Sequence, residues 1–557
     1  MRIVGLYNWH DGGYCVLEDG KIVEHVEIER YSRLKEDAGD SLQYFKDVYL
    51  KKNNLTLEDI DYWVSPCPNT NLEKGGGKDY DTHDYIPKEK IKFYSHHLCH
   101  AAHAFYSSGY DDALVLTIDS AGLDEDGSAI STTLYWCSGS EMVRLGAISN
   151  NGDPRIGAFS LGSVWGRLTR LVFKLQAGYP RGGQMGSVMA MAALGNPEKF
   201  KPDLKAMTTT DFLKVSHAPP GYKKGVYVPP EEDVFHPYLN KYREIAASDD
   251  QEKYNIAASL QQVTEDWFEF FMNSGLSAMQ QSGFKTRNIC FAGGVTLNSV
   301  ALGKMAQKYS TEFDNFFVPP VPYDGGLSIG ACQYLWHSVM GNDVEKDLFV
   351  SPYLGEVYGK EDVLEAIEER KEEVEAKESV SMEEAVDLLV DGNIVAIFQG
   401  RSESGRRALG NRSILANPGY KDMKSIINDK VKHRQWYRPF APSVLESAGE
   451  EWFENFFPSP YMGFVFKIKK EKLGLAKAIE HFDGTARIQT VREDQNPLYF
   501  NLITKFYEKT GIPMVLNTSF NDREPICETP GHSINCYLGT NIDYLYFPEF
   551  EILVSKK

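Results

Sequence analysis

Short apolar runs alternate with polar turns at the start of the chain and predict a group of strands. Arg2–Tyr7 and residues 14–18 predict two of them, and Asp19-Gly20 predicts a tight hairpin turn because both residues tolerate positive φ. Residues 22–28 complete the meander. The run ALVLTID, residues 113–119, predicts a buried strand that ends in an acidic loop containing glycine, and residues 132–136 predict another strand.

Further along the chain, the spacing of apolar positions predicts an alternation of helices and strands. Helices are expected at residues 159–175, 184–194, 254–283 and 325–335, and strands at residues 288–292, 394–398, 463–467, 513–516 and 544–547. Residues 201–250 have no clear period and predict an insertion or a long surface excursion. The charged segment 360–383 predicts a solvent-facing helix and a connection.

Length and charge limit the classes of protein that fit. A chain of 557 residues is too long for one compact core, and we expect a large domain at residues 1–348 and a smaller one at 349–557. The formal net charge of −19 argues against a surface built mainly to grip nucleic acid or anionic lipid. The eight cysteines form no C-x-x-C pair. The start lacks a signal-peptide pattern and no run is long enough to span a bilayer, so the expected location is the cytoplasm.

A dense histidine cluster, SHHLCHAAH at residues 95–103, is the first candidate site. On a helix, His96 and His100 lie on one face and can hold one ion. Asp119 and Asp324 each follow a predicted strand and enter a glycine-containing loop. Two imidazoles with one or two carboxylates form a mixed set of nitrogen and oxygen ligands that suits iron, manganese or zinc. A loop cap for Asp119 and a helix cap for Asp324 are the structural alternatives.

Four loops share a composition that suits phosphate or metal binding. Each places small or acidic residues after a predicted strand, at residues 8–13, 119–127, 292–295 and 324–326. Such loops let backbone N–H groups approach phosphates closely and let carboxylates orient a metal. Their order, among meanders and helices, predicts an α/β fold of the duplicated actin/hexokinase type with a nucleotide between two subdomains.

A strongly basic segment, residues 400–442, is the second candidate site. It holds four lysines and six arginines, at positions 401, 406, 407, 412, 434 and 438, within an acidic chain. Guanidinium groups match phosphate or carboxylate oxygens two at a time, so the segment predicts a pocket for a concentrated anion. Apolar residues such as Leu409, Ile414 and Phe440 are interleaved with the charges, which disfavours the alternative of a solvated basic face.

Motifs in both halves make the chain resemble the O-carbamoyltransferase family, which modifies antibiotics and nodulation factors. The matching segments cover nearly the whole chain and are HHLCHAA at 96–102, AGGVTLN at 292–298, DGG at 324–326, GR at 400–401, RALGNRSIL at 407–415, RPFAP at 438–442, GTAR at 484–487 and LNTSFN at 516–521. The resemblance implies a YrdC-like α/β C-terminal domain that makes carbamoyl-adenylate from carbamoyl phosphate and ATP, with Mg²⁺ as the expected companion of ATP. It also implies an N-terminal domain, similar to the tRNA threonylcarbamoyl-transfer enzymes, that passes the carbamoyl group to an acceptor hydroxyl at a metal, usually iron.

The resemblance also implies roles for individual residues. His96, His100 and Asp324 match the metal ligands, with Asp119 close by, and His10 matches a histidine near the acceptor, where it would accept the hydroxyl proton. Because carbamoyl phosphate and ATP are both polyanions, their site needs several cations. The expected substrate and nucleotide contacts in the matching motifs and beside them are Arg407, Asn411, Lys432, Arg434, Arg438, Arg487, Asn517, Ser519, Gly293, Gly294 and Asn298, with Lys432 as a movable point charge and Lys432 and Arg438 as catalytic cations.

The sequence departs from the family pattern in places and leaves other functions open. Arg406 stands where a proline is usual, residues 182–195 lack the usual lysine and proline, and Cys99 lies inside the histidine motif. The alternatives are a sugar kinase of the actin/hexokinase class, a non-enzymatic ATP-driven switch and a tRNA-modifying enzyme. The acceptor, whether a small molecule or a nucleotide such as a hydroxymethylated pyrimidine, is not readable from the sequence. A homodimer is plausible.

Overall fold

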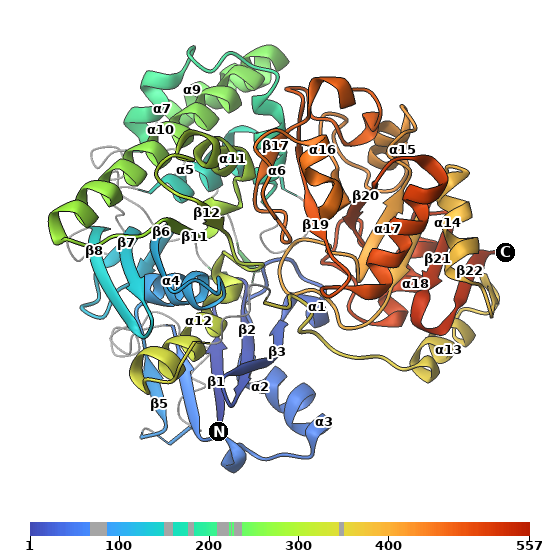
Figure 1. Cartoon of the computed structure of the whole chain (residues 1–557), viewed down its shortest axis with the longest axis horizontal. Helices are drawn as coiled ribbons and strands as arrows, with labels where there is room; N and C mark the ends of the chain where they lie inside the picture. The colour runs from blue at the N-terminus through green and yellow to red at the C-terminus, as the bar shows by residue number, and fades with distance from the viewer. Residues whose placement is uncertain are drawn as a thin grey trace. The chain divides into compact units, whose positions relative to one another are not determined.

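The computed structural model describes residues 1–66, 86–87, 89–149, 160–176, 183–208, 222–223, 226–227, 237–344 and 350–557. The chain forms two compact units, Met1–Val350 and Ser351–Lys557. Figure 1 shows helices and strands mixed throughout both units.

The first unit begins with a five-stranded sheet in the order β3-β2-β1-β4-β5. Its strands are β1 Arg2–Tyr7, β2 Gly13–Glu18, β3 Lys21–Glu27, β4 Tyr62–Ser65 and β5 Ile91–Phe93. The first three strands form an antiparallel meander, and Asp19 and Gly20 at its first turn both have positive φ, as predicted. β4 and β5 then add in parallel, so β1 lies at the centre of the sheet.

A second sheet of the first unit repeats this arrangement. Its order is β12-β11-β6-β7-β8, with β6 Asp112–Leu123, β7 Ala129–Ser138, β8 Glu141–Ser149, β11 Asn288–Ala292 and β12 Asn315–Phe317. β6, β7 and β8 form an antiparallel meander, and β11 and β12 add to β6 in parallel. The two sheets therefore share strand order and direction, which confirms the predicted duplicated α/β fold of the actin/hexokinase type.

Two helices that pack on each other connect these two sheets. α4 His96–Tyr106 packs on β6 and β11, α12 Leu327–Gln333 packs on β1 and β2, and the two helices pack on each other. Their close approach requires glycine, because a Cβ on Gly330 would lie 1.9 Å from the carbonyl oxygen of Cys99. All eleven residues of α4 are buried, so each of its four histidines must find a partner inside the protein.

The remaining helices of the first unit surround the two sheets. α10 Asp250–Ser282 is the longest and packs on α6, α7, α9 and α11. The others are α1 Glu29–Ser32, α2 Ser41–Phe45, α3 Lys51–Asn53, α5 Leu161–Arg167, α6 Met185–Ala192, α7 Lys201–Met207, α9 Pro237–Ser248 and α11 Ser299–Lys308.

The second unit is built on an eight-stranded mixed sheet in the order β13-β22-β21-β14-β15-β20-β16-β19. The strands are β13 Val374–Lys377, β14 Val395–Phe398, β15 Arg412–Ala416, β16 Ala441–Leu445, β19 Gln489–Val491, β20 Met514–Ser519, β21 Tyr544–Phe547 and β22 Ile552–Lys556. A separate pair joins β17 Val465–Lys467 to β18 Thr485–Arg487. The helices are α13 Lys360–Glu368, α14 Met382–Val390, α15 Met423–Lys430, α16 Gly449–Trp452, α17 Pro497–Thr510 and α18 Pro530–Leu538. This is an α/β unit, the class expected of a YrdC-like domain.

The structure corrects several predicted elements. Asp119 does not end a strand, because β6 continues to Leu123 across an irregularity in its pairing with β7. Asp324 lies seven residues after β12 and begins a short 3-10 turn, Asp324–Gly326. The segment 201–250 contains α7 and α9, and most of the rest lies outside the described residues. The segment 360–383 holds a strand, β13, as well as helix α13.

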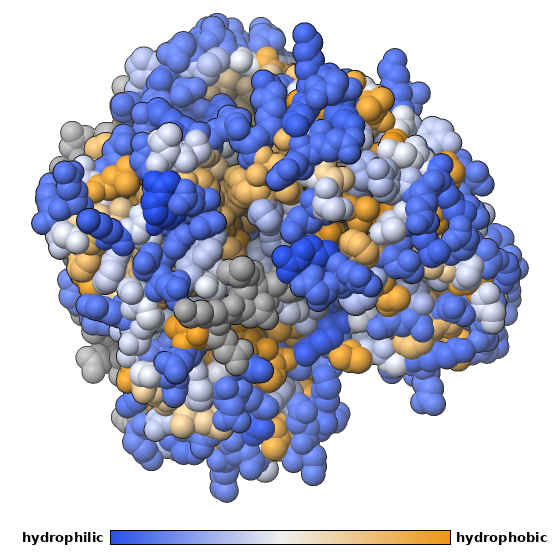
Figure 2. Space-filling view, viewed as in Figure 1, coloured by the Kyte–Doolittle hydropathy of each residue, from blue (hydrophilic) through white to orange (hydrophobic). Residues whose placement is uncertain are grey.

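Figure 2 shows that the face turned to the viewer is mainly hydrophilic, with hydrophobic residues scattered between the polar ones. This agrees with the charged fraction of 25% and the net charge of −19.

Candidate metal centre and arginine pocket

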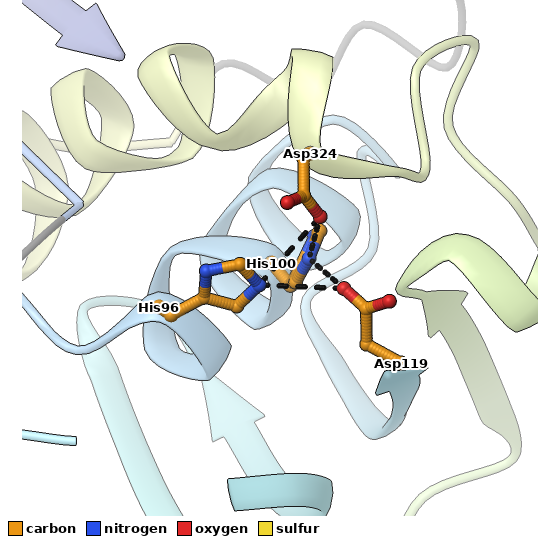
Figure 3. A group of neighbouring side chains, drawn as sticks. All are labelled: His96, His100, Asp119 and Asp324. Atoms are coloured by element: carbon orange, nitrogen blue, oxygen red, sulfur yellow. Dashed lines mark hydrogen bonds and ion pairs between the residues drawn. The ribbon is translucent and has the colours of Figure 1, made fainter. Parts of the chain in front are cut away.

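Four side chains from three elements of the first unit meet at one buried point. His96 and His100 come from α4, Asp119 comes from β6, and Asp324 comes from the turn before α12 (Figure 3). One ligand atom of each lies within 4.8 Å of the others, and all four residues are buried. The imidazole Nε2 atoms of His96 and His100 lie 3.3 and 3.2 Å from Asp119 Oδ2, and 3.6 and 3.5 Å from Asp324 Oδ1.

These separations fit the ligands of one metal ion. Ligand atoms about 2.0–2.2 Å from an ion, as in zinc sites, lie about 3.2–3.6 Å from one another in a tetrahedral arrangement. Two imidazole nitrogens and two carboxylate oxygens form a donor set typical of iron, manganese or zinc.

Glycine makes room for one of these histidines. A Cβ on Gly122, in β6, would lie 2.2 Å from the ring of His96. The irregular stretch of β6 between Ile118 and Gly122 is also the place where Asp119 turns toward α4. The irregular part of β6 therefore positions Asp119 and leaves room for the ring of His96.

The protonation of the group shows that it favours positive charge. Burial lowers the pKa of His100, but hydrogen bonds to Asp119 and Asp324 outweigh burial and raise this pKa to about 9. Burial raises the pKa of Asp119, and the contacts with His100 and His96 outweigh it and hold this pKa well below its usual range. Two carboxylates facing two imidazoles are thus arranged to hold a cation.

His97, the neighbour of His96, has a structural role. Its Nδ1 lies 2.6 Å from the hydroxyl of Thr117, and its Nε2 lies 2.8 Å from the carbonyl oxygen of Ile130. Burial lowers the pKa of His97 well below its usual range, so the ring is uncharged and both nitrogens are engaged. This explains why His97 does not belong to the metal-binding group.

Two residues from the first strand and turn reach the outer oxygen of Asp324. The hydroxyl of Tyr7 donates a hydrogen bond of 2.8 Å to Asp324 Oδ2, and His10 Nε2 lies 3.6 Å from the same atom. The other ring nitrogen of His10 lies 2.9 Å from Asp11 Oδ2. Oδ1 of Asp324 therefore faces His96 and His100, while Oδ2 faces Tyr7 and His10. No local pattern points to Tyr7, because Asp324 lies 317 residues away in the sequence.

Of the predicted glycine and asparagine contacts of the first unit, Gly293 and Gly294 lie beside β6 at the metal-binding group, and Asn298 begins α11. A Cβ on Gly293 would lie 2.3 Å from the carbonyl oxygen of Ile118, and one on Gly294 would lie 3.2 Å from Asp119 Oδ1. Asn298 caps α11 by accepting a hydrogen bond from Ala301 N. Both glycines permit close backbone packing, and the predicted nucleotide-binding role of these three residues stays a prediction.

The second unit gathers arginines in one place. Arg434 neighbours Arg438 and Arg487, and Arg487 neighbours Arg407, closely enough for each charge to disfavour the next. Burial lowers the pKa of Arg434 and that of Arg487 well below the usual range, and the neighbouring arginines lower both further. Burial also lowers the pKa of Arg438 to about 10. We call Arg407, Arg434, Arg438 and Arg487 the arginine pocket.

Three arginines of this pocket have no carboxylate partner within the described part of the chain. Arg434, Arg438 and Arg487 form no ion pair there, although each is partly buried. Nε of Arg487 is buried and has no hydrogen-bond partner among the described residues. Burying a cation without a counter-charge lowers the stability of the folded protein, and a bound anion would offset this penalty. The pocket is therefore arranged to bind an anion.

Other predicted contacts of the second unit hold its backbone. Lys432 Nζ donates to the carbonyl oxygens of Ser519 and Asn521, at 2.8 and 2.7 Å, and to Asn521 Oδ1, at 2.7 Å. Asn517 donates to the carbonyl oxygen of Ala408, at 2.9 Å, and Asn411 donates to that of Arg401, at 2.8 Å. Lys432 is thus tethered in this structure, whereas the sequence predicted a movable charge.

Two arginines of the basic segment are structural. Arg412 is fully buried, stacks 3.5 Å above the Phe398 ring and donates to backbone carbonyl oxygens, among them that of Gln399 at 2.6 Å. Arg401 donates to the carbonyl oxygens of Leu354 and Gly355. Counting charges along the sequence therefore overstates the cations available to a ligand, and it misses Arg487, which comes from the distant strand β18.

The chain has an α/β fold with a candidate metal centre and a group of neighbouring arginines, and the comparisons with known proteins show its class and its family. Family models described as "Carbamoyltransferase N-terminus" and "Carbamoyltransferase C-terminus" match residues 72–333 and 386–555. The chain belongs to the carbamoyltransferase family and is an enzyme that transfers a carbamoyl group.

Relatives from nodulating bacteria match most of the chain. "Nodulation protein NolNO" of Sinorhizobium fredii is 30% identical over 98% of this chain and 79% of its own length. "Nodulation protein NolO" of Bradyrhizobium diazoefficiens is 32% identical over 83% of this chain and 79% of its own length.

Solved structures are more distant. A structure of full-length HypF in a phosphate- and nucleotide-bound form is 16% identical, with a TM-score of 0.34, over 60% of this chain and 55% of its own. A TM-score this low supports no functional statement. Within the described residues, no helix is both long and apolar enough to cross a membrane.

Proposed function

We propose that the chain is an ATP-dependent O-carbamoyltransferase with two active sites. A C-terminal domain, residues 349–557, makes carbamoyl-adenylate from carbamoyl phosphate and ATP. An N-terminal domain, residues 1–348, transfers the carbamoyl group to an acceptor hydroxyl. The observation that carries the proposal is the arginine pocket, in which Arg434 and Arg487 lie beside other arginines; this concentration of positive charge fits two polyanionic substrates better than any neutral ligand.

In the first step, water cleaves carbamoyl phosphate into carbamate and inorganic phosphate. A carbamate oxygen then attacks the α-phosphorus of ATP, the bond to the β-phosphate breaks, and pyrophosphate leaves. Arg434, Arg438 and Arg487 reduce the repulsion between the two polyanions and stabilise the charge on the leaving group. The tether of Lys432 to Ser519 and Asn521 keeps the neighbouring loop in place.

The exposed aromatic rings near the pocket support nucleotide binding. Trp436 and Phe482 are 59% and 49% exposed, and their ring centroids lie 5.7 Å apart. Trp436 lies in the chain between Arg434 and Arg438. Exposed aromatic rings beside cations suit a nucleobase, which stacks while its phosphates contact the guanidinium groups.

In the second step, the acceptor oxygen attacks the carbamoyl carbon and AMP leaves. His10 takes the hydroxyl proton at Nε2, because its Nδ1–H is donated to Asp11 and leaves Nε2 as the acceptor. His96, His100, Asp119 and Asp324 would hold the metal, which fits iron(II), manganese or zinc. When bound, the ion would polarise the carbamoyl carbonyl group as a Lewis acid.

The nucleotide products test the proposal. The purified protein, loaded with iron(II) and given carbamoyl phosphate, ATP, Mg²⁺ and a panel of hydroxyl-bearing metabolites, should release pyrophosphate, and AMP should accumulate as carbamoylated acceptor forms. Formation of ADP and a phosphorylated acceptor would instead identify a kinase. If neither pyrophosphate nor AMP forms, the proposal is wrong.

A further inference from the structure

A second group of potential metal ligands lies in the C-terminal unit. The carboxylate of Glu524 and the thiols of Cys527 and Cys536 lie within 4.8 Å of one another, one ligand atom from each. Both cysteines are buried, and Glu524 is partly exposed. The two cysteines are nine residues apart, so no short motif reveals them; Cys527 follows β20 and Cys536 lies near the end of α18.

We propose that Glu524, Cys527 and Cys536 form a sulfur-rich site that binds one Zn²⁺ ion. Because the three ligand atoms are at most 4.8 Å apart, an ion can be placed within about 2.8 Å of all of them. A Zn–S bond is about 2.3 Å long, so each sulfur atom needs to move by only about half an ångström to bind the ion. Each thiol loses its proton to solvent as its S–Zn bond forms, and a water molecule takes the fourth position. This proposal does not depend on the reaction proposed above.

The surroundings of the site favour zinc over a hard cation. Thiolates select soft or borderline metals, whereas Mg²⁺ and Ca²⁺ prefer oxygen. Two thiolates, one carboxylate and Zn²⁺ carry one net negative charge, and the guanidinium of the buried Arg412 is close enough to Cys527 to interact electrostatically with it. Arg412 can therefore offset that charge. Glu524, at the partly exposed side, is the point at which an ion would enter.

The site would fasten two elements of the C-terminal unit together. Glu524 and Cys527 lie in the loop after β20, and Cys536 lies in α18. The same loop contains Asn521, which accepts hydrogen bonds from Lys432 and donates one of 2.7 Å to the carbonyl oxygen of Glu524. Zinc would thus hold the loop that tethers Lys432, and binding to the folded protein alone would raise its melting temperature.

Cobalt titration separates this site from the metal centre of the first unit. The full-length protein is stripped with a chelator and titrated with Co²⁺, which gives near-ultraviolet charge-transfer absorption when thiolates bind it. We expect this band in the wild type and in His100→Ala, which disables the metal centre. It should disappear in Cys527→Ser and in Cys536→Ser, and half-saturation should need about tenfold more Co²⁺ in Glu524→Gln. Cys137→Ser, a matched buried thiol of the first unit, should keep the band.

Protection from alkylation tests the wild type alone, in case a serine variant fails to fold. In mild urea, Zn²⁺ should slow alkylation of Cys527 and Cys536 by tenfold or more, measured by peptide mass spectrometry, and leave alkylation of Cys137 unchanged. Absence of a cobalt band in the wild type, its persistence in Cys527→Ser, or equal alkylation with and without zinc would overturn the proposal.

Discussion

The metal centre and the arginine pocket treat buried charge in opposite ways. At the metal centre, imidazoles face carboxylates at 3.2–3.6 Å, so opposite charges stabilise one another before any ligand binds. In the arginine pocket, guanidinium groups neighbour guanidinium groups, and burial and mutual repulsion together lower the pKa values of Arg434 and Arg487. At the metal centre each charge has a partner of opposite sign, whereas Arg434 and Arg487 have no carboxylate partner among the described residues and would gain a counter-charge from a bound anion.

The two sites differ in how a substitution should affect folding stability and activity. Removing a group from the balanced site leaves its partners buried and unpaired, which costs both stability and metal binding. Removing an arginine from the unbalanced site relieves repulsion, so function should fall while stability rises.

His100→Ala should abolish one half of the reaction and spare the other. His100 is fully buried and contacts both carboxylates of the centre, so its loss should remove the bound metal and lower carbamoyl transfer by on the order of 10³-fold. Metal content by mass spectrometry and transfer from supplied carbamoyl-adenylate are the measurements. Pyrophosphate release should persist; its equal loss would show that the two sites are not separate.

Arg487→Ala should show the opposite combination. Adenylate formation should fall by about 10²-fold, since one cation that contacts the developing charge is lost. Without anions, the melting temperature should rise, because Arg487 lies beside Arg407 and Arg438. Isotope exchange between pyrophosphate and ATP and calorimetry measure the two effects.

Arg412→Ala is the matched control for that variant. Arg412 donates to the carbonyl oxygens of Gln399 and Gly400 and stacks on Phe398, so its removal should lower the melting temperature. If Arg487→Ala were destabilised to the same extent, the arginine pocket would not be under electrostatic strain.

Sequence pattern was enough for features that depend on local spacing. The meander of β1 to β3 follows from alternating runs and the Asp19-Gly20 turn, and the shared face of His96 and His100 follows from helical periodicity. The position of Asp119 inside β6 did not follow, because an irregular strand pairing has no signature in the apolar pattern. Asp324, likewise, was expected at a strand end and lies in a separate turn.

Individual roles in the basic segment depended on contacts between distant residues. Arg412 and Arg434 look alike in the sequence, and each donates to a backbone carbonyl oxygen and stacks on an aromatic ring. They differ in their neighbours, because Arg434 lies beside Arg438 and Arg487. Tertiary packing decides between these roles, and a single sequence does not record it. The same limit hid Tyr7, because its partner Asp324 lies 317 residues away in the sequence.

Gly122→Ala should weaken the metal centre without touching a ligand. The added methyl group would lie 2.2 Å from the His96 ring, so the ring must move away from Asp119 and Asp324. We expect metal affinity to fall about tenfold, measured by competition with a chelator. Gly146→Ala, in β8, meets no atom within 4 Å and should bind metal like the wild type. Equal affinities in all three proteins would show that Gly122 does not position His96.

The smallest effect that we expect is a loss of stability of the C-terminal unit in acid, caused by protonation of His481. Burial, opposed by Asp483 and reinforced by Arg487 and Lys424, lowers the pKa of His481 to about 4, whereas an unfolded histidine titrates near about 6.5. Between these values the unfolded chain binds a proton that the folded chain does not. Stability therefore falls as pH drops from about 6.5 to about 4, and His481 adds no further loss below that range.

Calorimetry across this pH range with and without inorganic phosphate connects His481 to the pocket. His481→Gln should reduce the dependence of the melting temperature on pH, because the titrating group is gone. Phosphate bound among the arginines would offset the positive charge of Arg487, raise the pKa of His481 and reduce the same dependence in the wild type. If phosphate reduced it equally in His481→Gln, the anion would act elsewhere. If phosphate both raises the melting temperature and brings the pKa of His481 closer to its usual value, the counter-charge is what distinguishes the arginine pocket from the metal centre.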